Sequence, residues 1–252
     1  MNVEVRPQPD ATTGPLTLAI DIGGTGLKGA VLDAKGGLST DRIRVPTPEK
    51  STPENVVEAL VELVGQLGHF DRVSVGFPGV IRRGMVLTAP HLGTDDWRDF
   101  PLAKTLSERL KAPVRILNDA SVQGYGVISG HGVECVITLG TGVGFALYEQ
   151  GVLSPHMELG RYPVHKNTLL DEYLGNVAFR KISKKHWNRR VHRVLGYLET
   201  LVNYDTLYIG GGNAKHIKGD LPDNVRIVPN EAGVTGGIKL WEPRVDYAFA
   251  ET

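Results

Sequence analysis

The sequence has little cysteine and no long hydrophobic run. Cys135 is the only cysteine among 252 residues, so an internal disulfide framework and a cysteine-built zinc site are both excluded. It stands in an apolar stretch and is expected to be a buried core thiol. No apolar stretch approaches the roughly 20 residues of a membrane span, and no charged-then-apolar leader opens the sequence. These absences predict a cytoplasmic protein with no membrane partner.

An excess of charge of one sign is also missing. Lys and Arg number 28, as do Asp and Glu, so no overall field favours a nucleic-acid partner. A P-loop motif is absent from the sequence, which excludes a P-loop NTPase. Residues 24–29 match the dinucleotide pattern G-x-G-x-x-G, but that motif should open a helix. Residues 27–33 read instead as a strand, so NAD binding is disfavoured.

Two segments are nearly alike. Residues 18–37 read LAIDIGGTGLKGAVLDAKGG, and residues 135–151 read CVITLGTGVGFALYEQG. Each is an apolar run, a Gly-Thr-Gly turn and a second apolar run. Glycines at such turns expose backbone N–H groups, which form nests for phosphate. Either turn alone is explained by local structure, whereas the pair, with Asp21, Thr25 and Thr141 beside it, favours a phosphate chain held between two similar lobes.

The order of predicted elements is duplicated as well. The first half reads as strands at 16–20, 27–33, 42–45, 73–76 and 114–117, with helices from Thr52 and over 101–110. The second half reads as strands at 134–139, 143–148, just after 151, 206–209 and 225–228, with a long helix over 187–202 and a closing helix near 232–240. This predicts an α/β protein with two lobes, 16–120 and 121–252, around a central cleft. A disordered tail over 1–15 is expected, and the last helix has the option of packing back on the first lobe.

Asp119 is the candidate catalytic residue. It follows the apolar strand that ends at Leu117, and ligands of open α/β sheets bind at the carboxyl ends of strands. Phosphoryl transfer needs alignment, charge neutralisation and a proton acceptor near the attacking hydroxyl. The alternative is that Asn118 and Asp119 only cap the helix that starts at Ala120. An acid can do both.

Six stretches, in this order, resemble the ROK sugar kinases and especially their polyphosphate glucokinase branch. They are DIGGTGLKGAVLD (21–33), GFPGVIRRGMV (76–86), LNDA (117–120), TLGTGVG (138–144), ELG (158–160) and LYIGGGN (207–213). The resemblance implies an actin-like, ribonuclease H-like duplicated fold and a kinase that phosphorylates a hexose hydroxyl with polyphosphate or ATP. It also implies Mg²⁺ and a homodimer.

Family roles pass to matching residues. The resemblance makes Asp119 the general base and Asp21 the residue that orients magnesium-bound phosphate. It implies a sugar site at Asn118, Asp119, Glu158, Glu172, Arg161 and His91, the last two at positions that depart from the family. It implies a donor site at Asp21, Gly23, Gly24, Thr25, Lys28, Gly140, Thr141, Gly142, Gly210, Gly211 and Gly212.

Three departures qualify the resemblance. The cysteine-rich zinc cluster of the family is absent over 162–172, so no zinc is expected, and His156, His165 and His186 are interpreted as solvated or capping residues. Arg161 replaces the histidine of E-x-G-H; it could pair with Glu158 or recruit an anion. His91 stands where related kinases place a sugar-contacting asparagine. A kinase for another sugar, such as an amino sugar, and an inactive sugar- or nucleotide-binding protein therefore remain alternatives.

The donor is left open by one basic run. Within residues 180–193, apolar residues at helical spacing are expected to face inward. This leaves the basic side chains free for solvent, namely Lys184, Lys185, Arg189, Arg190 and Arg193. Such a run is usually a solvated helix face. It would also suit a polyanion longer than ATP, namely polyphosphate.

Overall fold

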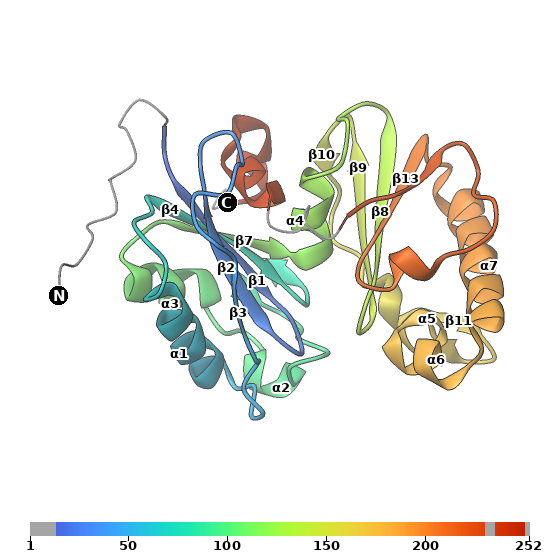
Figure 1. The fold of residues 1–252 in the computed structure, drawn as a ribbon, viewed down its shortest axis with the longest axis horizontal. Coiled ribbons are helices and arrows are strands. Elements are labelled where there is room, and N and C mark those ends of the chain that lie inside the picture. The colour runs from blue at the N-terminus through green and yellow to red at the C-terminus, as the bar shows by residue number, and fades with distance from the viewer. Residues whose placement is uncertain (1–13, 230–234, 250–252) are drawn as a thin grey trace.

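The computed structural model describes residues 14–229 and 235–249, and the predicted tail over 1–15 lies almost wholly outside this part. Two five-stranded sheets stand side by side, each built from one half of the chain (Figure 1). The α/β architecture with duplicated lobes is confirmed. Within the described residues, no helix has both the length and the apolar character that crossing a membrane requires.

The first sheet has the order β3-β2-β1-β4-β7. Its strands are β1 (Thr17–Ile22), β2 (Leu27–Leu32), β3 (Ile43–Val45), β4 (Arg72–Phe77) and β7 (Val114–Asn118). The first three pair antiparallel; a tight turn joins β1 to β2, and a longer connection over 33–42 joins β2 to β3. The pairs β1–β4 and β4–β7 are parallel, each joined by a helical crossover.

The second sheet repeats this topology in the order β10-β9-β8-β13-β14. Its strands are β8 (Val133–Leu139), β9 (Val143–Glu149), β10 (Val152–Leu153), β13 (Thr206–Gly210) and β14 (Val225–Ile227). The hairpin strands are again antiparallel and the last two parallel. The duplication predicted from the sequence therefore holds at the level of strand order.

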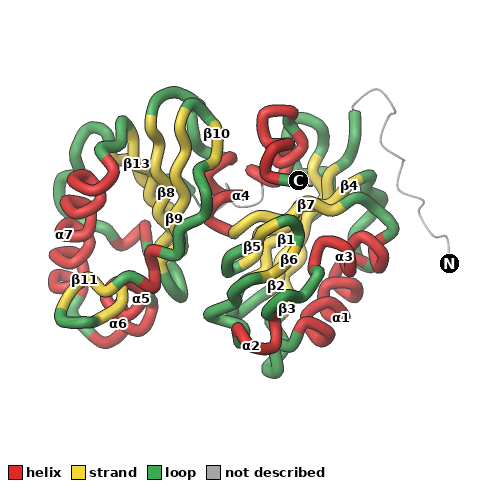
Figure 2. Tube along the Cα trace, turned by 180° about the vertical axis from the view of Figure 1, so that it is seen from behind, coloured by secondary structure: helices red, strands yellow, loops and turns green. Residues whose placement is uncertain are grey.

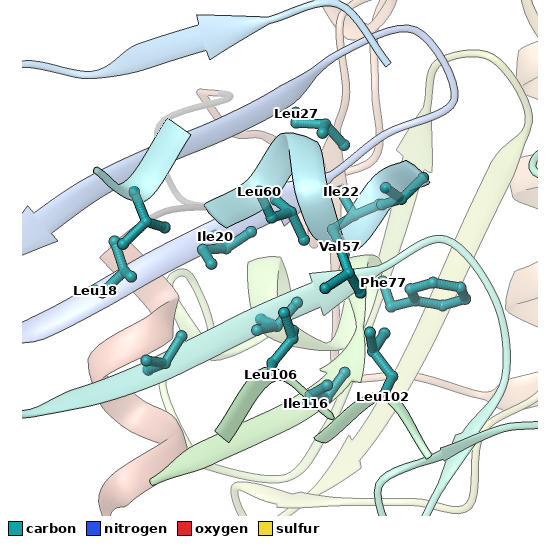
Figure 3. Close-up of a cluster of buried hydrophobic side chains, with 14 of the residues drawn as sticks. Leu18, Ile20, Ile22, Leu27, Val57, Leu60, Phe77, Leu102, Leu106 and Ile116 are labelled. Atoms are coloured by element: carbon teal, nitrogen blue, oxygen red, sulfur yellow. The ribbon is translucent and has the colours of Figure 1, made fainter. Parts of the chain in front are cut away.

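Two helices cover one face of the first sheet. α1 (Pro53–Val64) begins after Thr52, whose hydroxyl accepts from the Asn55 amide at 3.4 Å, with proline in its first turn. α3 (Leu102–Leu110) lies beside it. Their apolar sides pack on alternate residues of the strands, and Leu18, Ile20, Leu60 and Leu106 meet in this core (Figure 3). The smaller elements here are β5 (Ile81–Arg82), β6 (Met85–Val86) and α2 (Thr94–Trp97).

The second sheet is covered on one face by α5 (Leu170–Leu174), α6 (Asn176–Lys181) and the long α7 (Lys184–Val202). Trp187, Val191, Val194 and Leu198 face inward from α7, as their spacing predicts. The short elements on the way are η1 (Leu159–Arg161), β11 (Pro163–His165), β12 (Thr168–Leu169) and η2 (Ala214–His216). Cys135 is buried in this core, as expected from its apolar surroundings.

The short helix α4 (Asp119–Tyr125) lies between the two sheets (Figures 1 and 2). It touches β4 of the first sheet and both β8 and β9 of the second. Its Val122 and Tyr125 belong to an apolar cluster shared with Val136 and Tyr148. The first residue of α4 is therefore held where the lobes meet.

The closing segment differs from the expected helix near 232–240. Residues 230–234 lie outside the described part, and the chain beyond them forms two 3₁₀ helices, η3 (Gly236–Trp241) and η4 (Pro243–Ala248). η3 packs back on the first sheet, where Ser74 Oγ donates to the Gly237 carbonyl at 2.7 Å and Arg115 donates to the Leu240 carbonyl at 2.5 Å. Pro243 lacks the N–H needed to continue a helix, which accounts for the break between them.

Candidate active site between two glycine turns

A cavity of about 270 Å³ lies between the lobes, and both glycine turns line it. The turn at 23–26 joins β1 to β2, and the turn at 140–142 joins β8 to β9. Each is closed by one short backbone hydrogen bond, from Gly23 N to Gly26 O and from Gly140 N to Gly142 O, both 3.0 Å long. The duplicated hairpins therefore face one shared space.

Close packing around Gly142 explains its lack of a side chain. A Cβ there would lie 2.6 Å from Nε2 of His91 and 2.7 Å from Oδ1 of Asp171. His91 belongs to the first lobe and Asp171 lies in the first turn of α5 in the second, and their side chains approach to 3.8 Å. Asp171 Oδ1 also accepts from the Val143 amide at 2.7 Å, which fixes the end of the turn.

The first turn is flanked by positive charge. Asp21 is the last residue but one of β1 and receives the Lys28 ammonium at 2.7 Å, from the position directly opposite on β2. This pair explains how a carboxylate is tolerated in an otherwise apolar strand. Arg44 on β3 donates to the Thr25 carbonyl at 3.2 Å and also lines the cavity. Arg44 was not predicted as a site residue, although its strand places it beside Lys28.

The third glycine segment is only partly in the cavity. Gly211 and Gly212 line it, whereas Gly210 does not. Gly211 has φ +86°, and a Cβ on it would lie 2.4 Å from the Leu139 carbonyl oxygen, so only glycine fits. Gly210 abuts the amide of Gln123, a cavity residue on α4 that was likewise not predicted.

Asp119 opens α4 at the base of this cavity. Asn118 caps the helix by accepting from the Ala120 amide at 2.9 Å, and its own amide donates to the Gly79 carbonyl at 3.2 Å. Asp119 Oδ1 accepts from the same Ala120 amide at 2.8 Å. The dipeptide therefore does cap the helix, and the cap uses only one carboxylate oxygen of Asp119, so its position also suits the catalytic interpretation.

The surroundings of Asp119 raise the pKa of its carboxyl group from 3.8 to about 7. Desolvation at the base of the cleft is the main cause, followed by the negative charge of Asp21. The Ala120 amide and His156 act in the opposite direction, and Glu158 adds to the increase. Its side chain keeps some contact with the cavity. A carboxylate with a pKa near neutrality is suited to accept a proton.

The acidic residues on the opposite wall are Glu158 and Asp171. Glu158 precedes η1 and meets His156, whose Nε2 lies 2.5 Å from its Oε1. His156 is therefore neither solvated nor a helix cap, and that interpretation was wrong. Met157 also lines the cavity. No group of three or more potential metal-ligating side chains occurs among residues 14–229 and 235–249.

Two predicted sugar ligands do not reach the cavity. Glu172 is exposed and accepts from the Leu169 amide at 3.2 Å, which closes the first turn of α5. The neighbouring Asp171 faces the cavity instead, because consecutive helical residues differ by about 100° in direction. Arg161 is exposed on η1, and Glu158 pairs with His156 rather than with Arg161.

Two kinds of sugar kinase resemble this chain, one over nearly its whole length and one over about half of it. It is 31% identical over 249 residues to the polyphosphate glucokinase of Mycobacterium tuberculosis, covering 92% of this chain and 94% of that protein. An N-acetylmannosamine kinase of Escherichia coli is 39% identical over 142 residues, 54% of this chain and 48% of that protein.

Solved structures share the fold. The inorganic polyphosphate/ATP-glucomannokinase of Arthrobacter sp. strain KM superposes with a TM-score of 0.82 at 33% identity, covering 90% of this chain and 98% of that one. A ROK family glucokinase of Streptomyces griseus, at 21% identity, gives 0.76 over 89% of this chain and 98% of that one. These matches confirm the actin-like duplicated fold. The model of the ROK family matches residues 17–157, and with this the chain belongs to the ROK family.

Proposed function

We propose that this protein is a sugar kinase that transfers a phosphoryl group from polyphosphate or ATP to a hexose hydroxyl, with a glucose 6-phosphate type of product. The observation that supports this most directly is the position of Asp119, which shares one cavity with both glycine turns. Its pKa of about 7 leaves the base about half ionised near neutral pH.

In the proposed reaction, Asp119 accepts the proton of the sugar hydroxyl. The hydroxyl oxygen then bonds to the terminal phosphorus, and the bond from that phosphorus to the bridging oxygen breaks, so the electron pair leaves with the shortened donor. The turns at 23–26 and 140–142 present backbone N–H groups to the phosphate chain. Lys28 and Arg44 add positive charge near the transferred group.

Asp21 is the residue that would hold Mg²⁺, together with oxygens of the donor. Magnesium is commonly bound by one or two carboxylates plus substrate phosphates, which agrees with a cavity-lining aspartate beside the first turn. When bound, the ion neutralises charge on the phosphate chain. Zinc is not part of the proposed site.

Polyphosphate is supported as a donor by a basic surface next to the second turn. Asn176 N donates to the Gly140 carbonyl at 2.9 Å, and Asn213 bonds the Asn176 side chain at 2.9 Å. Three lysines lie close to His216, just beyond these residues. Desolvation is the main cause that lowers the pKa of His216, and the positive charges of Lys184, Lys215 and Lys218 lower it further. These three lysines give a longer polyanion a path out of the cavity. Arg190 and Arg193 are not free, since both bond Tyr173.

The acceptor site is proposed at Asn118, Asp119, Glu158 and His91, and Asp171 is added as the acid of α5 that faces the cavity. Carboxylates accept hydroxyl hydrogens, so these acids suit a neutral polyol. An amino sugar is the alternative acceptor. Arg161 and Glu172 lie away from the cavity, and their predicted contacts have no support in its lining.

We also propose that the protein is cytoplasmic and forms a homodimer. The boundary between the two lobes is proposed near residue 120, and the lobes are proposed to close on the substrates. An apolar groove between η1, β11 and α7 supports the dimer: Tyr162 is 58% exposed and Leu201 is 71% exposed. Surfaces of this kind on a folded chain often form interfaces.

A panel of reactions tests the function. The purified protein is incubated with Mg²⁺, glucose, mannose or N-acetylmannosamine, and either ATP or polyphosphate, and sugar phosphate is measured. Turnover of at least one sugar with either donor is expected. Sugar binding without any turnover would support the inactive binding protein instead.

A second experiment tests polyphosphate as the donor. Replacing Lys184 and Lys215 by glutamine should raise the KM of polyphosphate more than that of ATP, and the exposed Lys35→Gln serves as control.

A further inference from the structure

His156 packs its ring against a carboxylate of the proposed sugar site. It lies between β10 and η1, its side chain is 11% exposed, and Nε2 is 2.5 Å from Oε1 of Glu158. A carboxylate only accepts, so the hydrogen of this contact sits on Nε2. The exposed Arg161, the other basic residue near Glu158 in sequence, makes no ion pair in the described part of the chain.

The contact leaves half of the carboxylate available. Oε1 of Glu158 is occupied by His156, and no other side-chain hydrogen bond of Glu158 is found among the described residues. The Glu158 side chain is 27% exposed, and the residue lines the cavity. A hydrogen bond to one oxygen restrains the carboxylate, and its second oxygen is left to accept from another donor.

We infer that His156 is a positioning residue for the sugar: its Nε2–H holds one oxygen of Glu158 so that the other accepts a hydrogen bond from a sugar hydroxyl. The inference rests on the proposed function, because it requires Glu158 to touch the acceptor. In this chain the histidine that contacts the glutamate stands two positions before it, whereas the histidine of the E-x-G-H motif stands three positions after the glutamate.

The two ring nitrogens of His156 allow a sharp test. Nδ1 is buried and has no hydrogen-bond partner in the part of the chain that the structure describes. Glutamine places an amide N–H near the position of Nε2, whereas asparagine reaches only as far as Nδ1. His156→Gln therefore keeps the donor to Glu158, and His156→Asn and His156→Ala remove it.

The experiment measures KM for the sugar and for the donor in these three variants. His156→Ala and His156→Asn should raise the KM of the sugar by about 10- to 100-fold, as expected for a lost hydrogen bond to a charged group. His156→Gln should stay within about 3-fold of the wild type. The KM of the donor should not change in any of them, and the exposed His131→Gln is the matched control.

A double-mutant cycle separates positioning from a general effect on folding. If His156 acts through Glu158, His156→Ala should add little to the KM of the sugar once Glu158→Gln is present. An unchanged sugar KM in His156→Ala, equal losses in all three variants, or a parallel rise in the KM of the donor would each overturn the inference.

Failure of the proposed function has a different signature. If the wild type turns over no sugar, calorimetric titration with glucose replaces KM as the readout for the same variants. Weaker glucose binding in His156→Ala and His156→Asn, but not in His156→Gln, would uphold the positioning role without kinase activity. A wild type that neither binds nor phosphorylates sugars would overturn both.

Discussion

Ionisation of Asp119 opposes folding, because the pKa of its carboxyl group is about 7 in the folded protein and near its ordinary value of 3.8 in the unfolded chain. When the folded state raises the pKa of an acid, the free energy of unfolding falls as pH increases between the two values. A shift of this size corresponds to roughly 4 kcal/mol at full effect. The cavity admits water to part of the side chain, so we expect about 2 kcal/mol. Asp119→Asn should therefore be more stable than the wild type at pH 8 by that amount.

Urea unfolding at pH 4, 6 and 8 measures this difference. The asparagine variant keeps Oδ1, which accepts from the Ala120 amide, so the start of α4 is preserved. The gain in stability should be near zero at pH 4 and larger at pH 6 and pH 8. A gain that does not depend on pH, or a less stable variant at pH 8, would refute the assignment of a desolvated, like-charge environment.

Two further predictions concern a buried acid outside the cavity and the second glycine turn. Glu134 is fully buried; desolvation works to raise its pKa, but hydrogen bonds from Ser129, Gly130 and Tyr208 outweigh that effect and lower the pKa. Glu134→Gln should reduce the free energy of unfolding by about 2 kcal/mol at pH 7, because hydrogen bonds to a charged group are lost. The loss should shrink as pH falls below 4.5, the ordinary pKa of the group, and urea unfolding at pH 7 and at acid pH measures the difference. Gly142→Ala should raise the KM of the donor at least tenfold because a Cβ meets His91 and Asp171, whereas Gly140→Ala, whose Cβ meets nothing within 4 Å, should have a smaller effect. Equal effects of the two alanines in steady-state kinetics would contradict the packing argument.

Local patterns allowed most of the fold to be predicted. The Gly-Thr-Gly hairpins, the Thr52 cap with Pro53 and the apolar spacing of α7 are each set by neighbouring residues, and all three appear as expected. The closing segment was less predictable. Its conformation depends on packing against Ser74 and Arg115, which are more than 120 positions away in sequence.

Contacts across the cavity could not be predicted from the sequence. The choice between Asp171 and Glu172 depends on how α5 is turned towards β9, and local patterns contain no measure of that rotation. The pairing of His156 with Glu158 needs a bend before η1 that brings residues two apart together. Arg44 and Gln123 line the cavity because of tertiary placement, and neither stands in a motif.

The central claim is that Asp119 deprotonates the sugar hydroxyl. Single-turnover phosphoryl transfer by Asp119→Asn, with the best sugar and donor from the panel and Mg²⁺ present, tests it directly. We expect the rate to fall by about 100- to 10,000-fold, the range for loss of a general base, while calorimetry shows sugar affinity within a few-fold of the wild type. A rate within tenfold of the wild type would contradict the account.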